Sequence, residues 1–143
     1  MTNKENTLLQ LKEKGHRFSV MRNFVLDTLN KNHEPLSASD FQKLLKDKKI
    51  SANKTTLYRE LNLLKKEGIV LEIQLTGNKR WYELASRNHH HHIVCIKCDK
   101  VKDFIECGSK NIISKVLKQT PDFAEITNHT FDFFGLCKSC VRK

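Results

Sequence analysis

The chain has 143 residues, with 26 lysines and arginines against 16 aspartates and glutamates, which gives a formal net charge of +10. This length holds one ordinary domain or two small ones, and no apolar run is long enough to cross a membrane. So positive a charge predicts an acidic partner, with nucleic acid first. Residues 1–86 carry 16 basic against 10 acidic residues and residues 87–143 carry 10 against 6, so charge alone does not tell which half meets that partner.

Residues 1–67 show the apolar spacing of four helices. The first ends near Gly15, the second is capped by Ser19 and the third by Ser37. The fourth begins after residues 51–53 and ends at Gly68. The apolar residues that carry this spacing are Leu8, Leu9, Leu11, Met21, Val25, Leu29, Phe41, Leu44, Leu45, Leu57, Leu61 and Leu64.

Two strand-like runs follow at residues 69–75 and 80–84, and residues 76–79 between them are typical of a hairpin turn. Helices followed by a hairpin in this order predict a winged helix-turn-helix, which is a DNA-binding fold. The fourth helix would be its recognition helix, because its outer face is polar and cationic. That face consists of Lys54, Thr55, Tyr58, Arg59, Asn62 and Lys66.

Such a face suits the major groove of double-stranded DNA. Lys54 and Lys66 would hold phosphates, while Tyr58 and Arg59 would meet base edges or thymine methyl groups. The alternative is a helix face that is merely solvated, which is the usual fate of exposed lysine and arginine. An exposed aromatic side chain among positive charges has little structural reason to be there, so Tyr58 favours the DNA interpretation.

The pattern changes after a short polar linker at residues 86–88. The apolar strands beyond it exceed what a core of this size can cover, which predicts a homodimer interface. The expected elements are strands at residues 90–97, 101–105 and 125–134 and a helix at residues 109–119. The predicted class is therefore α+β, with a winged-helix domain at residues 1–85 and a small α/β dimerisation and metal-sensing domain, held by structural zinc, at residues 89–143.

Two Cys-x-x-Cys pairs, Cys95/Cys98 and Cys137/Cys140, lie near the two ends of this second domain. Two thiolates three positions apart can chelate one ion from a tight turn, so the two pairs predict a structural zinc site with four sulfur ligands. Disulfides are the alternative, but no apolar signal segment opens the chain, and a cytoplasmic protein with reduced thiols is expected. A thioredoxin-type redox motif would need an alternating βα pattern, which this sequence does not show. Cys107 is expected to be a small buried apolar residue outside the four.

Four consecutive histidines, residues 89–92, precede the first cysteine pair. The β-branched residues after them favour a strand over a solvated loop, and their internal position argues against an expression tag. Because side chains alternate along a strand, His90 and His92 would face one way and His89 and His91 the other. One strand could therefore supply ligands to two separate metal sites.

Several short motifs along the chain are specific. The strongest are Thr55-Thr-Leu-Tyr58-Arg59 and the histidine–cysteine run from His89 to Cys98. Supporting pieces are Gly15-His-Arg17-Phe-Ser19, Pro35-Leu-Ser37-Ala38, Glu67-Gly-Ile-Val70, Thr127-Asn-His129 and Gly135-Leu-Cys137-Lys-Ser-Cys140. Over nearly its full length, the chain resembles the ferric uptake regulator family of metal-dependent bacterial repressors. The resemblance implies a DNA-binding winged helix, a dimerisation domain, a metal that sets the angle between the DNA-binding halves, and a contact of Arg17 with the DNA backbone or minor groove.

By this resemblance, His90 and His92 belong to a regulatory metal site to which Glu83 and Asp103 add carboxylates. The remaining ligand would be a histidine before the third helix. The matching position holds a proline, and His33, two residues earlier, is the candidate. This ligand set spans both domains, so metal binding would favour one arrangement of them.

The other strand face offers His89 and His91, and His129 matches a histidine that completes a third metal site in some members of the family. The family commonly has an aspartate where His91 stands. Lys110 occupies the position of an expected glutamate, with Glu106 close in sequence. The sequence leaves the occupancy of this third group open.

The identity of the sensed metal also stays open. Two histidines with carboxylates suit Fe(II), Mn(II) or Zn(II). Zinc-sensing relatives often have a cysteine in the regulatory site, and none is present at the end of the wing here. Peroxide-sensing relatives have an aspartate in place of Glu83, although Asp103 matches theirs. Regulation by iron or zinc is therefore expected, with manganese as a further candidate and peroxide sensing as the alternative within the family.

Two other classes of function explain part of the pattern. A metalloenzyme would use the ligands as a catalytic zinc or non-haem iron centre, and a metal-storage protein would use them for binding alone. Neither class gives Tyr58 and Arg59 a role, and the chain has no His-Glu-x-x-His motif. We therefore expect a repressor that is not an enzyme, acts as a homodimer on double-stranded operator DNA, and has no membrane partner and no small-molecule substrate.

Overall fold

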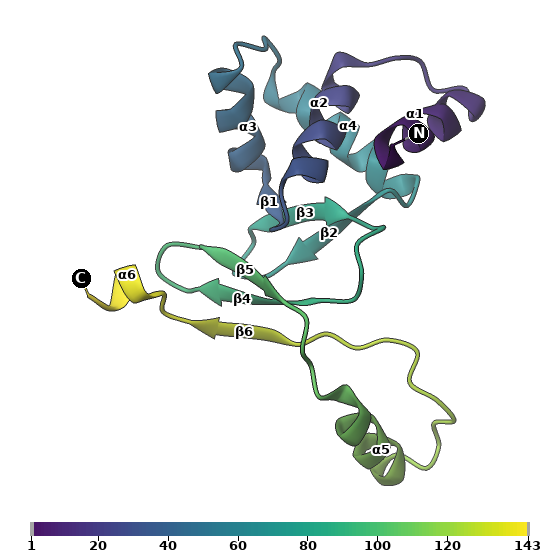
Figure 1. Cartoon of the computed structure of the whole chain (residues 1–143), viewed down its shortest axis with the longest axis vertical. Coiled ribbons are helices and arrows are strands. Elements are labelled where there is room, and N and C mark those ends of the chain that lie inside the picture. The colour runs from purple at the N-terminus through teal and green to yellow at the C-terminus, as the bar shows by residue number, and fades with distance from the viewer. Residues whose placement is uncertain (1, 143) are drawn as a thin grey trace. The chain divides into compact units, whose positions relative to one another are not determined.

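The computed structural model describes residues 2–142, which form two compact units, the first ending at Arg87 and the second beginning at Asn88 (Figure 1). The boundary falls in the polar segment at residues 86–88. Each unit contains helices and one three-stranded sheet, which confirms the predicted α+β class. Every helix in the described residues is too short or too polar to span a bilayer.

The helices of the first unit are α1 (Asn3–Glu13), α2 (Val20–Lys31), α3 (Ala38–Asp47) and α4 (Lys54–Lys66). Side-chain caps set where they begin, because Ser19, Ser37 and Asn53 each accept a hydrogen bond from a backbone N–H of the first turn of α2, α3 and α4. After α4 the chain turns at Gly68, whose φ of 71° lies in the left-handed region. Local sequence signals therefore fix the ends of the helices.

The apolar faces of these helices meet in one core within the first unit. Leu57, Leu61 and Leu64 of α4 are fully buried in it, and the rings of Phe24 and Phe41 pack edge to face with centroids 6.3 Å apart. Burial of one side of α4 leaves its opposite side free to face a partner.

The sheet of the first unit has the strand order β1-β3-β2 and is antiparallel, with β1 (Leu36–Ser37), β2 (Val70–Gln74) and β3 (Arg80–Leu84). The predicted hairpin is β2 with β3. The two-residue strand β1 was not predicted, because so short a segment has no readable alternation. It pairs with β3 and joins the segment before α3 to the hairpin.

The second unit has the strand order β5-β4-β6, with β4 (His91–Cys95) antiparallel to β5 (Val101–Phe104) and parallel to β6 (Asp132–Gly135). Its helices are α5 (Ser109–Gln119) and α6 (Lys138–Val141). The last two histidines of the run, His91 and His92, belong to this central strand, and His92 has a neighbour on both sides. In Figure 1, α5 lies beyond the end of this sheet, and no residue of this helix is buried in the described part of the chain.

The strand predicted at residues 125–134 is wrong over most of its length. Only Asp132–Gly135 forms strand, whereas residues 121–131 contain a turn and no helix or strand in the described structure. The pairing of β4 with β6 starts at His92 opposite Asp132, and β4 itself begins only at His91. Residues before 131 therefore have no neighbouring strand to pair with.

Candidate DNA-facing helix and metal centres

The polar side of α4 carries the residues predicted to meet DNA. Lys54, Thr55 and Arg59 are exposed, and Tyr58 is 36% exposed. The Nζ atom of Lys54 lies 5.8 Å from the centre of the Tyr58 ring, which is a cation–π distance. The helix therefore presents an aromatic side chain and several cations together on one exposed face.

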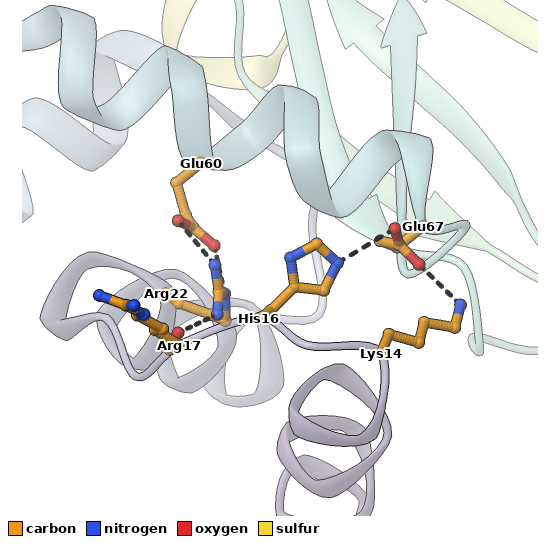
Figure 2. Close-up of polar contacts among 6 residues, drawn as sticks. All are labelled: Lys14, His16, Arg17, Arg22, Glu60 and Glu67. Atoms are coloured by element: carbon orange, nitrogen blue, oxygen red, sulfur yellow. Dashed lines mark hydrogen bonds and ion pairs between the residues drawn. The ribbon is translucent and has the colours of Figure 1, made fainter.

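A buried ion pair fastens α2 to α4 (Figure 2). Arg22 Nε donates to Glu60 Oε1 at 2.6 Å, and both side chains are less than a tenth exposed. Arg22 Nη1 also donates to the backbone carbonyl of Arg17 at 2.6 Å. This contact fixes the backbone at Arg17, while the Arg17 side chain is exposed and points away from the ion pair. The sequence analysis missed this pair, although charged residues on otherwise apolar helix faces are a recognisable signal.

Glu67, just after α4, holds the start of the same loop. Lys14 Nζ donates to one of its carboxylate oxygens at 2.6 Å, and His16 Nε2 lies 3.2 Å from the other (Figure 2). These two neighbours, Lys14 first, lower the pKa of the Glu67 carboxyl. Arg17 follows directly and is tied on its other side by Arg22. The loop that carries Arg17 is thus held at two points, directly by Glu67 and, through Arg22, by Glu60 of α4.

The four cysteines of the two pairs come together in the second unit. The sulfur atoms of Cys95, Cys98, Cys137 and Cys140 all lie within 4.8 Å of one another. Cys98 Sγ and Cys137 Sγ are 3.8 Å apart, and zinc–sulfur bonds of 2.3 Å give a tetrahedral sulfur–sulfur edge of about 3.8 Å. A disulfide would need about 2.0 Å, and all four thiols are free. The spacing therefore fits a zinc ion and does not fit disulfide bonds.

Backbone N–H groups point at two of these sulfur atoms. The N–H of Cys137 donates to Cys95 Sγ at 3.4 Å and, with the N–H groups of Cys98 and Lys97, lowers the pKa of the Cys95 thiol to about 6. The pKa of Cys137 is lowered in the same way, first by the N–H of Cys140. Cys140 instead donates to its sulfur neighbours, Cys137 first, which raises its pKa to about 12. The backbone therefore favours the thiolate form of Cys95 and Cys137, which is the form of cysteine that binds metal.

His92, in the centre of β4, lies between two carboxylates. The strand register puts it opposite Asp103 on β5 and Asp132 on β6. Its Nε2 is 3.7 Å from Asp103 Oδ1, and its Nδ1 is 3.5 Å from Asp132 Oδ1. A carboxylate beside a metal-ligating histidine orients the ring and raises its basicity. Asp103 was a predicted ligand, whereas Asp132 was missed because the parallel pairing of β4 with β6 cannot be read from the sequence.

The other residues predicted for the regulatory site come from both units of the chain. His90 Nδ1 is 2.6 Å from the carbonyl oxygen of Asn88, and its ring centre is 4.9 Å from that of His92. In the first unit, Glu83 on β3 is buried and bound by Arg87 at 3.3 Å. His33 is exposed in the segment between α2 and β1. Their shared role as ligands stays a prediction.

A further group of metal-ligating side chains contains His89, His91 and His129. His89 Nε2 and His129 Nε2 are 3.2 Å apart, and the ring centres of His89 and His91 are 4.6 Å apart. The fourth member is Cys107, whose Sγ lies 3.9 Å from His89 Nε2. Cys107 is outside the four-cysteine group, as expected, but it is half-buried beside histidines and is not a buried apolar residue.

His91 is the most buried member of this group, with 2% of its surface exposed. Its Nε2 has no hydrogen-bond partner within the described residues, while its Nδ1 accepts a bond of 3.3 Å from the N–H of Phe131. Burial lowers the pKa of His91, and the neighbouring His89 and His129 lower it further. The ring is therefore held in its neutral form, which is the form of histidine that binds metals.

Several known proteins are similar to this chain in sequence and fold. A family model described as the ferric uptake regulator family matches residues 13–134. The ferric uptake regulation protein of Neisseria gonorrhoeae is 30% identical over 141 residues, which cover 98% of this chain and 96% of that protein. The peroxide-responsive repressor of Staphylococcus aureus is 27% identical over 139 residues, covering 97% and 92%. The structure of the Helicobacter pylori ferric uptake regulator, described as revealing three functional metal binding sites, matches with a TM-score of 0.80 at 28% identity, covering 96% of this chain and 90% of that one.

Proposed function

The chain belongs to the ferric uptake regulator family, and we propose that it is a metal-responsive repressor that binds operator DNA as a homodimer when its regulatory metal site is filled. One observation carries this proposal. The same chain has an exposed helix face with Tyr58 among cations and separate groups of metal-ligating side chains. An enzyme or a metal-storage protein would need only the second feature. A metal-responsive repressor needs both the DNA-binding face and the metal-ligating groups, and it needs no enzyme activity.

The four-cysteine group would hold structural zinc. The sulfur spacing of 3.8 Å supports this assignment, as do the lowered pKa values of Cys95 and Cys137. Zinc bound there would join the turn after β4 to the start of α6 and hold the second unit together, because the binding energy of a structural zinc ion is folding energy.

The sensory site would take His90, His92 and Asp103 from the second unit and Glu83 from the first, with His33 as a further candidate. Asp132, whose Oδ1 lies 3.5 Å from His92 Nδ1, supports this, because a carboxylate of this kind is a typical partner of a metal-ligating histidine. Ligands drawn from both units would make metal affinity depend on how the units are arranged. That dependence is what couples a metal to DNA binding.

On DNA, α4 would enter the major groove with Lys54, Thr55, Tyr58 and Arg59. Arg17 would reach the backbone or the minor groove beside it, and its anchoring by Arg22 supports that position. Such contacts to phosphates set the register of a protein on the duplex. A bacterial repressor acts where the DNA is, so we expect the protein in the cytoplasm.

A second copy of the chain would cover apolar surface of the second unit. Phe133 and Phe134 on β6 are each 54% exposed, and Ile112 and Val116 on α5 are 45% and 40% exposed. Apolar surface of this kind usually marks an interface. A symmetric dimer would also present two copies of α4, as operators with two half-sites require.

We expect iron or zinc as the sensed metal, with manganese as a further candidate, because histidines with carboxylates suit all three. Peroxide sensing is the second candidate function, and the similarity to the Staphylococcus aureus repressor supports it. Glu83 counts against it, because the resemblance to peroxide sensors would require an aspartate at this position.

The proposal is tested by retention of a duplex promoter fragment from the operon that encodes the chain. Protein supplied with Fe(II), Zn(II) or Mn(II) should retain the fragment in a gel-shift assay, and chelated protein should release it. Retention should fall steeply with salt, because phosphate contacts release counterions. Equal retention with and without metal, or equal retention of an unrelated duplex, would contradict a metal-responsive repressor.

A further inference from the structure

We propose that Cys107 is a metal ligand, and that with His89, His91 and His129 it forms a tetrahedral three-histidine, one-cysteine zinc site in the second unit. The site is separate from the four-cysteine group and from the pair His90 and His92. The inference does not depend on repression, because it concerns metal bound within one unit of the chain.

The spacing of the ligand atoms matches a zinc tetrahedron. Zinc–nitrogen bonds of about 2.05 Å and zinc–sulfur bonds of about 2.3 Å give edges of about 3.3 Å between two nitrogens and about 3.6 Å between nitrogen and sulfur. His89 Nε2 lies 3.2 Å from His129 Nε2 and 3.9 Å from Cys107 Sγ. All four ligand atoms lie within 4.8 Å of one another. The two distances from His89 Nε2 thus differ from the tetrahedral edges by about 0.1 Å and 0.3 Å.

The buried ring of His91 is an independent sign of a ligand. Its Nε2 lacks a hydrogen-bond partner within the described residues although the side chain is only 2% exposed, and a buried polar atom without a partner is uncommon in native proteins. A metal bond at Nε2 requires the ring tautomer that carries its proton on Nδ1. Nδ1 would then no longer accept the long 3.3 Å hydrogen bond from the Phe131 N–H, and the metal bond at Nε2 would replace it.

The fold brings Cys107 to the histidines through the connection between β5 and α5. β5 ends at Phe104 and α5 begins at Ser109, and Gly108 between them has a φ of 51°, in the left-handed region. His129 comes from the segment before β6, which contains no helix or strand over residues 121–131 of the described structure. A shared metal would therefore connect this segment to β4 and to the start of α5, and would hold residues that no strand pairing holds.

The chemistry of the four ligands selects the metal. Three imidazole nitrogens and one thiolate suit zinc, whereas Fe(II) and Mn(II) sites in proteins favour carboxylate oxygen. The side chain in the position of the expected glutamate, Lys110, is exposed, and so is Glu106. Cys107 thus takes the place of a carboxylate. We expect the group to prefer zinc over iron, whichever metal the regulatory site senses.

The first test counts zinc in protein that carries His90→Ala, so that the regulatory site does not contribute. Adding Cys107→Ala should remove one zinc ion per chain or weaken its binding at least about 100-fold, because even partners of ligands account for 10–100-fold in affinity. Adding Glu106→Ala, an exposed neighbour, should change nothing. Unchanged zinc content and affinity in the Cys107→Ala protein, or loss in the Glu106→Ala protein, would overturn the proposal.

The second test leaves Cys107 in place and measures its alkylation by iodoacetamide, read by mass spectrometry of peptides. Zinc-loaded protein should protect Cys107, and His129→Ala should abolish that protection while the four-cysteine group stays protected. Fe(II) in place of zinc should protect it poorly. If Cys107 reacts at the same rate with and without zinc, or if His129→Ala leaves it protected, Cys107 is not a ligand.

Discussion

The two units of the chain are stabilised in different ways. The main apolar core lies entirely in the first unit and includes leucines of α4 that are fully buried. In the second unit, the buried apolar residues among those described are Val94, Cys95 and Val101. A unit with so small a core needs a cross-link, and two groups of metal-ligating side chains lie within it. The helix proposed to face DNA thus rests on a hydrocarbon core, whereas we propose that the second unit depends on metal.

Loss of the four-cysteine site should have the largest effect on this contrast. We expect Cys95→Ser, or a strong chelator, to unfold the second unit and dissociate the dimer, because structural zinc contributes about 10–16 kcal/mol of folding energy in small peptides. Zinc content, circular dichroism and light scattering measure the loss of zinc, of folded structure and of the dimer. A stable dimer with unchanged zinc content would show that the four cysteines do not hold the structural metal.

A cavity in the core of the first unit should have the opposite pattern. Leu61 is fully buried, and Leu61→Ala should lower the free energy of unfolding of the first unit by about 2–5 kcal/mol. Zinc content should not change. Leu71 is 48% exposed on β2, so Leu71→Ala is the matched control and should have little effect in denaturant unfolding. If Leu61→Ala released zinc, the two units would not be stabilised independently.

His90→Ala tests how the two units are coupled. The variant should keep its dimer and its structural zinc but lose the metal-stimulated part of operator binding, a coupling of about 1–3 kcal/mol or 5–150-fold in DNA affinity. The same change at His89, on the other face of the histidine run, should have a smaller effect. A gel-shift titration with Fe(II), Mn(II) or Zn(II) gives both numbers. A normal metal response in His90→Ala with loss in His89→Ala would exchange the roles of the two faces.

Two variants of the first unit separate base reading from phosphate contact. Tyr58→Ala should lose preference for the operator while the protein stays folded and keeps its metals. Arg17→Ala should cause the smaller change. If Arg17 contacts one phosphate, the slope of log affinity against log salt should become shallower by about one. Salt titrations of operator and unrelated DNA measure both. An unchanged operator preference in Tyr58→Ala would move recognition away from α4.

The same contrast explains what the sequence could predict. In the first unit, side-chain caps at Ser19 and Ser37 and the apolar spacing of the helices are local signals, and the helices begin where those signals are. The Arg22–Glu60 ion pair was missed, because the partners are 38 positions apart and meet only when α2 packs on α4.

In the second unit, the decisive contacts are long-range and polar, which periodicity does not report. The neighbours of His92 depend on the pairing of β4 with both β5 and β6. The strand predicted before Asp132 fails for lack of a partner. Cys107 looked like a packing residue because no spacing rule connects one cysteine to a histidine 18 positions away. Residue types pointed to metal, but only the fold shows which of them meet.

Hydrogen exchange of metal-loaded and metal-stripped protein tests the contrast between the two units most directly. Removal of metal should raise amide exchange across residues 88–142, including β4 and β6, while α2 and α4 of the first unit keep the protection of a packed core. Restored zinc should bring the protection back. If the second unit stayed protected without metal, or if both units lost protection together, the division into a core-stabilised and a metal-stabilised unit would be wrong.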